Sequence, residues 1–279
     1  METDSHLKDC TLGKETLYAT TYHPECLFPI PRSLKREEMG IDPNNLPFKG
    51  FDYWNHYEVS WLNEKGKPIL AFAEIVYNCT SPFIVESKSL KFYFHSFNQF
   101  QFGSIEQVRQ TIQKDLEAIL KTPVSVTVYP FSRLAELPAQ NAFSGIFLDD
   151  LDISCSAYHV DKHLLQTEDT EVTETLYTDL LKSNCLITHQ PDWGSVQIQY
   201  EGHKINHESL LRYIVSYRKE NEFGEPCVER IFTDILTQCK PKVLGVYGRY
   251  TRRGGLGINA YRSTESADLK GFNFRLPRQ

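Results

Sequence analysis

The sequence lacks any apolar run of about 18 residues, the length that a membrane-spanning helix requires, so we expect no such helix. It also lacks a Cys-x-x-Cys pair, and its 7 cysteines are scattered and odd in number. That pattern favours a reducing cytoplasm over a disulfide scaffold. The first residues are polar and acidic, which predicts that no secretory signal is present there.

Positive charge is in deficit. Lys and Arg number 30 against 36 Asp and Glu, which gives a net charge of −6. A nucleic-acid binder depends on a basic surface, so direct nucleic-acid binding is not expected. The composition, 41% hydrophobic and 24% charged, is typical of a globular protein. At about 150 residues per domain, the 279 residues suggest roughly two domains.

The pattern of apolar and turn residues predicts an α+β protein with antiparallel strands, because runs of strands precede runs of helices. We expect strands at 51–63, 69–77, 124–129, 151–158, 175–181, 195–200, 242–250 and 256–263, and helices at 88–98, 104–122, 207–217 and 225–239. We find no close internal sequence repeat. The predicted organisation is a lead-in (1–45), an N-terminal module (46–135) and a C-terminal module (136–279).

The most informative segment runs from Ser183 to Ser195 and contains Cys185 seven residues before Asp192. A nucleophilic thiol needs to be partly exposed and able to form a thiolate, and it benefits from a nearby proton donor or acceptor. A rigid turn can return such an aspartate to the sulfur. The alternative is a small buried hydrophobic residue beside a turn-forming Asp. A metal is a further alternative, since Cys185 and His189 have ligand spacing, although only two ligands are local.

Two other segments could bind a ligand. Glu86 precedes a helix, and a buried carboxylate there could accept two N–H donors from a guanine-like or pterin-like heterocycle. The alternative is a solvated charge cluster at the helix start. Arg252, Arg253, Gly254 and Gly255 could form a phosphate cradle, because glycines admit close approach and arginine donates bidentate hydrogen bonds. A glycine-rich hairpin tip with basic flanks is the simpler reading. No Rossmann fingerprint surrounds it.

Considered together, these segments strongly resemble the NADPH-dependent 7-cyano-7-deazaguanine reductases, the nitrile reductases of queuosine biosynthesis, in their long two-module form. The resemblance covers nearly the whole chain and rests on the motifs Glu86-Ser87-Lys88-Ser89-Leu90-Lys91, Ser183-Asn184-Cys185, Gln190-Pro191-Asp192-Trp193-Gly194-Ser195, Cys227-Val228-Glu229-Arg230-Ile231-Phe232 and Tyr250-Thr251-Arg252-Arg253-Gly254-Gly255-Leu256.

The resemblance implies a tunnelling fold, in which each module is an antiparallel sheet layered with two helices, and it favours a homodimer. The implied reaction reduces the nitrile of 7-cyano-7-deazaguanine, a step in tRNA modification, to an aminomethyl group with two NADPH and no metal. Cys185 would form a covalent thioimide and Asp192 would supply the proton. The resemblance assigns substrate binding to Val85, Glu86, Ser87 and Glu225, and cofactor binding to Lys88, Ser89, Arg252, Arg253, Gly254 and Gly255.

One departure from the family pattern concerns proton transfer. The family usually has Phe-His-Glu before its counterpart of Cys227, whereas this chain has Phe223-Gly224-Glu225. General acid–base help is typically worth about 10²–10⁴-fold, so losing the imidazole leaves two alternatives open. The chain is a nitrile reductase, or it is a weakened or non-catalytic module that binds a deazaguanine or pterin-like base. Replacing Gly224 by His is expected to raise turnover.

Overall fold

The computed structural model describes residues 21–186, 188–266 and 272–279. The earlier helices and strands are η1 Pro24–Cys26, β1 Pro29–Pro31, α2 Arg32–Glu38, β2 Lys49–Leu62, β3 Pro68–Asn78, β4 Phe83–Val85, α3 Ser87–His95, α4 Ile105–Leu120, β5 Val124–Pro130 and η2 Phe131–Glu136. The later ones are β6 Ile146–Phe147, η3 Lys162–Leu164, β7 Thr167–Asn184, β8 Pro191–Ile205, α5 His207–Ser216, η4 Tyr217–Lys219, α6 Gly224–Cys239, β9 Val243–Tyr250 and β10 Leu256–Ser263.

These elements form two compact units whose segments interleave along the chain. The first unit comprises the residues up to Pro43, Tyr53–Leu137 and Arg252–Gly257, and the second comprises Asn44–Asp52, Pro138–Thr251 and Ile258–Gln279. Strands β2 and β10 each have residues in both units. The short basic segment 252–257 thus belongs to the same unit as α3, although it lies more than half the chain away in sequence.

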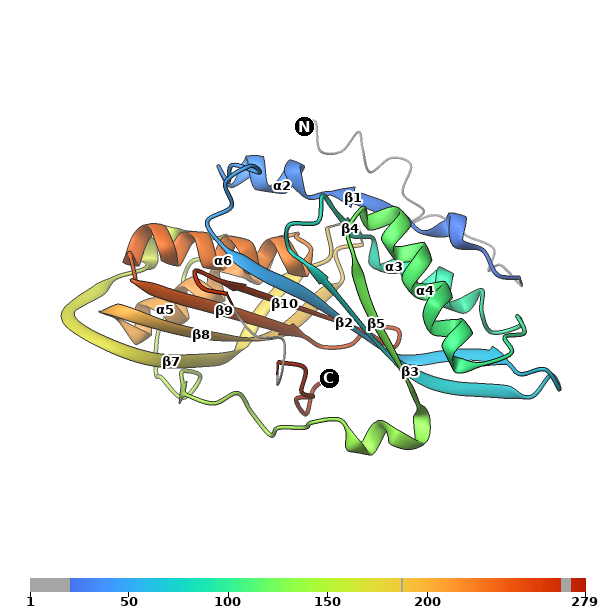
Figure 1. Cartoon of the computed structure of the whole chain (residues 1–279). Helices are drawn as coiled ribbons and strands as arrows, with labels where there is room; N and C mark the ends of the chain where they lie inside the picture. Colours follow the sequence, from blue (N-terminus) through green and yellow to red (C-terminus); the bar gives the residue numbers. More distant parts are fainter. Residues whose placement is uncertain (1–20, 187, 267–271) are drawn as a thin grey trace. The chain divides into compact units, whose positions relative to one another are not determined.

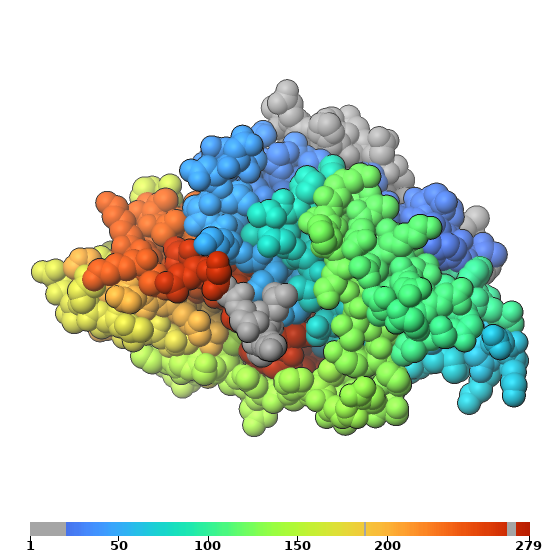
Figure 2. All heavy atoms as spheres, viewed as in Figure 1, coloured from blue at the N-terminus to red at the C-terminus, as the bar shows by residue number. Residues whose placement is uncertain are grey.

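In the first unit, β3 lies between β2 and β5 in the sheet, and α3 and α4 accompany these strands (Figure 1). Helix α4 buries one stripe at a spacing of four, formed by Val108, Ile112, Leu116 and Leu120. Its opposite side is polar and lies at the surface (Figure 2). Ser104 caps this helix, since its Oγ accepts from the Gln107 amide at 3.1 Å, while the Gln107 side chain accepts from Gly103 at 2.8 Å.

In the second unit, the strand order is β10–β9–β8–β7–β6, and all pairs but β6–β7 are antiparallel. Helices α5 and α6 lie on one face of this sheet (Figure 1). Val196 and Ile198 of β8 are fully buried. A side chain at Gly248 of β9 would come within 2.4 Å of the Val228 side chain of α6, so the absence of a Cβ permits the close approach of helix and sheet.

The two units repeat one arrangement of hydrogen bonds, which we did not find as a sequence repeat. In α3, Ser89 Oγ donates to the Glu86 carbonyl, Ser96 Oγ to the Tyr93 carbonyl, and the Tyr93 hydroxyl to Asp115 of α4. The same three bonds recur in the second unit, from Ser209 to Asn206, from Ser216 to Tyr213 and from Tyr213 to Asp234. The distances agree within 0.1 Å, since they are 2.7, 2.6 and 2.7 Å in the first unit and 2.8, 2.6 and 2.7 Å in the second.

A buried ion cluster joins α6 to the sheet of the second unit. The Arg262 guanidinium of β10 donates to Glu229 of α6 at 2.8 Å and lies 2.9 Å from Asp52. All three side chains are at most 2% exposed. Arg262 also donates to the carbonyl groups of Phe51 and Tyr261. Buried charges are tolerated when their hydrogen bonds are satisfied, and this cluster therefore determines how α6 lies on the strands.

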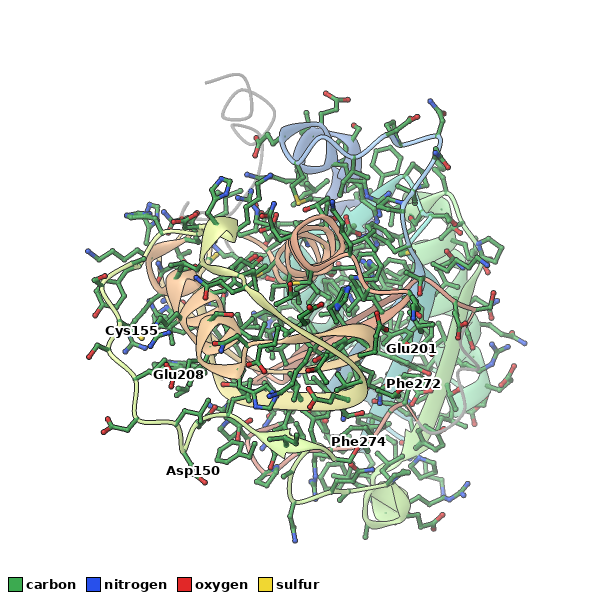
Figure 3. All side chains as sticks on the ribbon, turned by 90° about the vertical axis from the view of Figure 1, so that its left-hand side faces the viewer. Asp150, Cys155, Glu201, Glu208, Phe272 and Phe274 are labelled. Atoms are coloured by element: carbon green, nitrogen blue, oxygen red, sulfur yellow. The ribbon has the colours of Figure 1, made fainter. Side chains whose placement is uncertain are left out.

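Most of the expected elements are confirmed within a few residues, and the mixed antiparallel architecture is confirmed as well. One expectation is wrong, because residues 151–158 form no strand. Their backbone runs along the surface as a connection between β6 and β7 (Figure 3). The alternation of apolar and polar residues there cannot distinguish a strand from an extended loop. Within the described ranges, no helix is both long and apolar enough to cross a membrane.

Replacement of Arg262 by Met should lower the free energy of unfolding by about 3–5 kcal/mol, because it removes the cation shared by two buried carboxylates. Urea unfolding measures this change. Arg133→Met is the control, since Arg133 pairs with Glu136 at the surface, where both side chains are more than half exposed. That control should change stability by no more than about 1 kcal/mol. Similar losses in the two variants would contradict the structural role of the buried cluster.

Candidate active site

Cys185 lies at the tight turn that joins β7 and β8. Its amide donates to the Gln190 carbonyl at 2.8 Å, and its carbonyl accepts from the His189 amide at 3.0 Å. His189 has a positive φ of 55°, a conformation that few residues other than glycine adopt, and one that closes the turn. Cys185 is a free cysteine that is only 5% exposed, so the partial exposure expected of a nucleophilic thiol is wrong for the chain as described. The turn therefore holds the thiol in a defined and shielded position.

Asp192 lies at the same end of this hairpin. In the antiparallel register, Asp192 is paired with Ser183, two residues before Cys185. Side chains two residues apart point to the same face of a strand, and diagonal neighbours across strands are within reach of one another. The register thus places Asp192 and Cys185 at the same end of the β7–β8 hairpin. Its partial exposure leaves Asp192 accessible to solvent, unlike the thiol.

The start of α6 is attached to the same turn. Asn184 donates to the Glu220 carbonyl at 2.7 Å and accepts from the Glu222 amide at 2.9 Å, so the segment before α6 runs alongside the residue that precedes Cys185. His189 Nδ1 lies 3.2 Å from the Asn221 side chain. Glu225 follows in the first turn of α6 and is 1% exposed. Three predicted site residues of the second unit are therefore positioned by one short set of backbone bonds.

The first unit has the same local arrangement without the thiol. Leu62 donates to the Phe100 carbonyl at 2.9 Å and accepts from the Phe102 amide at 3.0 Å, as Asn184 does with its own partners. The next residue is Asn63, whose amide donates to Lys67 across the turn as Cys185 donates to Gln190. Cys185 gives the turn of the second unit a thiol, and the turn of the first unit has Asn63 at the equivalent position.

Gly224, where the resemblance leads one to expect a histidine, is covered by an aromatic ring. A Cβ at Gly224 would lie 2.9 Å from Cε2 of Tyr250, and a Cβ at Gly194 would lie 3.3 Å from the same ring. Tyr250 is buried, and its hydroxyl interacts with the Cys227 thiol, whose pKa burial raises to about 12. Burial also raises the pKa of Tyr250, and the negative charge of Asp192 adds to that effect. The two glycines therefore create the space that the tyrosine ring occupies.

Glu86 is the N-cap of α3 and is fully buried. Its two carboxylate oxygens accept from the amides of Lys88 at 2.8 Å and Ser89 at 2.7 Å. Burial raises the pKa of this carboxyl, and these amides together with the charge of Lys91 oppose the shift. Val85 ends β4 and Ser87 begins α3, on either side of the cap. A carboxylate oxygen has two lone pairs, so one capping bond each leaves acceptor capacity for a ligand.

The basic glycine-rich segment forms a tight two-residue turn in the first unit. Arg253 donates to Leu256 at 3.0 Å and Leu256 back to Arg253 at 3.4 Å, while Gly254 and Gly255 have φ of 60° and 75°. This is the geometry of a type I′ hairpin turn, which glycine adopts without strain. The Gly255 carbonyl accepts from the Tyr57 amide at 2.9 Å.

Lys91 is a residue that our reading of the sequence did not assign to this site. A Cβ at Gly254 would lie 3.2 Å from its side chain, so the turn packs directly on α3. The Arg252 guanidinium lies 5.1 Å from the centre of the Tyr57 ring, and Lys88 lies 5.3 Å from that of Phe92. Cations from α3 and from the hairpin tip thus belong to one compact unit. Only the packing reveals this, because the two segments are far apart in sequence.

The predicted site residues therefore fall into two sets. The first unit contains Val85, Glu86, Ser87, Lys88, Ser89, Arg252, Arg253, Gly254 and Gly255, and the second unit contains Cys185, Asp192 and Glu225. Among the residues that the structure describes, no group of three or more His, Cys, Asp or Glu side chains is arranged to hold a metal ion.

A cavity of about 210 Å³ lies elsewhere in the second unit. It is lined by Gln140, Ser144, Gln197, Gln199, Tyr247, Phe272 and Phe274. Phe272 and Phe274 are close together beside the strands (Figure 3). None of the predicted catalytic or binding residues lines it.

The fold and the site define an α+β protein of two similar sheet-and-helix units, in which a buried thiol and a carboxyl group lie at the same end of one hairpin. Family models match residues 18–128, described as "Nitrile reductase, 7-cyano-7-deazaguanine-reductase N-term", and residues 191–268, described as "QueF-like protein". The chain belongs to this two-module, tunnelling-fold family of nitrile reductases.

Three curated relatives share the name NADPH-dependent 7-cyano-7-deazaguanine reductase. The relative from Legionella pneumophila (strain Paris) is 58% identical over 268 residues, which cover 96% of this chain and 94% of that protein. The relative from Dechloromonas aromatica (strain RCB) is 52% identical over 267 residues, covering 94% of each chain. That from Azoarcus sp. (strain BH72) is 51% identical over 254 residues, covering 91% of this chain and 90% of that protein.

Replacement of Gly255 by Ala should destabilise the chain more than replacement of Gly66 by Ala. Both glycines have nearly the same φ, 75° and 73°, so both variants incur the cost of about 1–2 kcal/mol for a left-handed residue. Only the Cβ at position 255 meets neighbours, Glu58 Oε2 at 2.8 Å and the His56 ring at 3.3 Å. Urea unfolding should therefore show a larger loss for Gly255→Ala. Equal losses would mean that the tip is not packed on β2.

Proposed function

We propose that this chain reduces the nitrile of 7-cyano-7-deazaguanine to an aminomethyl group with NADPH, as the nitrile-reducing step of queuosine biosynthesis. The observation that carries the proposal is the β7–β8 turn, which holds the Cys185 thiol and the Asp192 carboxyl at one end of a hairpin, beside the start of α6. The names of relatives more than half identical over nearly the whole chain support the substrate and the cofactor.

Cys185 is the nucleophile in this proposal. Its sulfur, as thiolate, adds to the nitrile carbon, and the nitrogen takes a proton from Asp192, which gives a covalent thioimide. A thiolate is favoured near the N-terminal end of a helix, where the backbone N–H groups carry partial positive charge. In support of this, the hydrogen bonds of Asn184 with Glu220 and Glu222 bring the segment before α6 alongside the residue that precedes Cys185.

NADPH, when bound, supplies hydride for each of the two reduction steps. The residues available to hold it fit a phosphate-bearing ligand. The turn at Gly254 and Gly255 has no side chain of its own, and a Cβ at either position would be in contact with neighbours within 3.3 Å. Arg252, Arg253 and Lys88 supply cations in the same unit, and Ser89 lies in the first turn of α3.

Glu86 and Glu225 would recognise the base. Both side chains are at most 1% exposed, and both occur at the N-terminal end of a helix. A carboxylate accepts the paired N–H donors that the amine and ring edge of a deazaguanine present. Val85 and Ser87 flank Glu86 and would contact the same substrate. The imine formed by the first hydride must be kept from water, and the burial of the thiol and of each glutamate within its own unit is consistent with that requirement.

We further propose that the chain acts in the cytoplasm as a homodimer and does not bind nucleic acid directly. The six cysteines that the structure describes form no disulfide with one another, which suits a reducing compartment in which Cys185 keeps its nucleophilic form. The net charge of −6 supports the lack of a polyanion-binding surface.

A second candidate function is a module that binds the base without reducing it. The observation that favours it is the glycine at position 224, where the Tyr250 ring takes up the space beside the first turn of α6. A missing general acid–base group slows proton transfer without removing the two glutamates that would bind the base.

Incubation with 7-cyano-7-deazaguanine decides between these two functions. The intact mass of the wild-type chain should rise by one substrate molecule, and two NADPH should be consumed per nitrile. Cys185→Ala should form no adduct and show no turnover. Cys155→Ala, at a cysteine in the loop before β7, should behave as the wild type does. Tight binding of the base with no adduct, unchanged in Cys185→Ala, would establish the non-catalytic alternative.

The role of position 224 is tested by two replacements compared with each other. Gly224→Ala adds only the Cβ that meets the Tyr250 ring, and overpacking of this kind should cost about 1–3 kcal/mol of stability. Gly224→His adds the same Cβ with an imidazole, so its turnover should exceed that of Gly224→Ala by about tenfold or more. Steady-state NADPH oxidation measures the turnover of the two variants. Equal turnover in the two variants would refute a proton-transfer role for an imidazole here.

A further inference from the structure

The side chains of Arg278 and Gln279, here named the C-terminal clamp, hold the strand ends that carry the proposed site. Gln279 is 8% exposed and uses both ends of its amide. Its Oε1 accepts from Arg249 Nε at 2.6 Å, and its Nε2 donates to the Tyr250 carbonyl at 3.1 Å and to Asn259 Oδ1 at 3.3 Å. A single side chain therefore connects β9 with β10.

Arg249 needs the Gln279 amide as a hydrogen-bond acceptor. Its side chain is 1% exposed and stacks on Phe274, with the guanidinium 5.1 Å from the ring centre. Besides Gln279, it donates to the Tyr247 hydroxyl and to the Phe272 carbonyl. Across the described part of the chain, no carboxylate lies within ion-pair distance of Arg249, and its Nη2 makes no hydrogen bond. A buried cation in this situation depends on each neutral acceptor it has.

Arg278 acts on β8. Its Nη2 donates to the carbonyl groups of Asp179 at 2.9 Å and Gly194 at 3.2 Å, and to Ser195 Oγ at 3.1 Å. Gly194 and Ser195 lie two and three residues after Asp192 along the strand, with Trp193 between. The guanidinium thus fixes the backbone next to the proposed proton donor.

The clamp lies on the face of the sheet opposite α6, where the last residues of the chain are found (Figure 1). Alternation along the strands places Tyr250 on the other face, where its ring contacts the Gly194 and Gly224 positions. The two strand ends are also tied to each other, since the Thr251 amide donates to the Trp193 carbonyl at 2.8 Å. Contacts made on one face consequently determine the positions of side chains on the other.

We propose that Arg278 and Gln279 are positioning residues that fix the strand ends at Asp192 and Tyr250 and so hold Asp192 in the geometry needed for proton transfer to the nitrile nitrogen. The clamp is not itself in contact with the reacting atoms. This inference rests on the proposed function in that Asp192 must be the proton donor, but the rigidity of the two strand ends can be measured without any substrate.

Gln279→Glu separates positioning from stability. A glutamate keeps an acceptor for Arg249 and adds the negative charge that this cation lacks, so the melting temperature should not fall. It removes the N–H groups that donate to the Tyr250 carbonyl and to Asn259 Oδ1. A carboxylate oxygen then faces these two acceptor oxygens. We expect amide hydrogen exchange to rise about tenfold in peptides covering 191–196 and 248–252, and not in the distal half of β8. The rate of adduct formation should fall about tenfold, with the final yield still one adduct per chain.

Arg278→Ala should have the same two effects, and Arg275→Ala is its matched control. Arg275 is exposed, and the contacts that the structure gives it are made by its backbone, to Pro138 and Gln140. This control should leave local exchange and adduct rate as in the wild type.

Wild-type exchange at both strand ends in Gln279→Glu and Arg278→Ala would overturn the clamp. So would a uniform rise in exchange along β8 and β9 with a lower adduct yield, because that result describes unfolding. If the wild-type chain forms no adduct, the proposed function fails, and the exchange measurement still decides whether these two side chains fix the strand ends.

Discussion

The second unit depends on one buried cation. Arg262 lies between Asp52 and Glu229 with no exposed surface, and its donors connect helix α6 to β10 and to the first residues of β2. Two carboxylates and one guanidinium in a dry interior tolerate little displacement, because each lost bond leaves a desolvated charge. The contact at Glu229 thereby holds helix α6, including its first turn with Glu225, against the strands. The backbone bonds of Asn184 then tie the Cys185 turn to the same helix start.

The chain uses one scaffold twice and gives it different chemistry. The same Tyr–Asp and Ser–carbonyl bonds stabilise the helix pair in each unit, and the same backbone bonds tie a hairpin turn to the start of the second helix. At the turn, Asn63 stands in the first unit where Cys185 stands in the second. At the cap of the first helix, Glu86 stands in the first unit where Asn206 stands in the second. The shared bonds maintain the framework, and the residues at these two positions differ between the units.

Much of this could be predicted from the sequence. The stripe of Val108, Ile112, Leu116 and Leu120 can be predicted from local periodicity. The cap at Ser104 and the helix start at Glu86 can be predicted from the local sequence. The strand expected at 151–158 was wrong because an extended loop has the same alternation. The internal repeat was missed because it resides in a few buried polar residues, such as Tyr93 and Tyr213, among many that differ. The organisation into a lead-in and two modules stays a prediction.

The sequence by itself determined the class of protein, since long motifs around Cys185, Asp192 and Glu86 specify a nitrile reductase family whatever their geometry. Only the tertiary structure decided which cations accompany the Gly254–Gly255 turn, what covers Gly224, and which residues hold the strand ends. Lys91, Tyr250 and Gln279 acquire their roles from contacts between segments far apart in the chain. Such contacts depend on how helices and strands pack, and no local pattern of side chains records that packing.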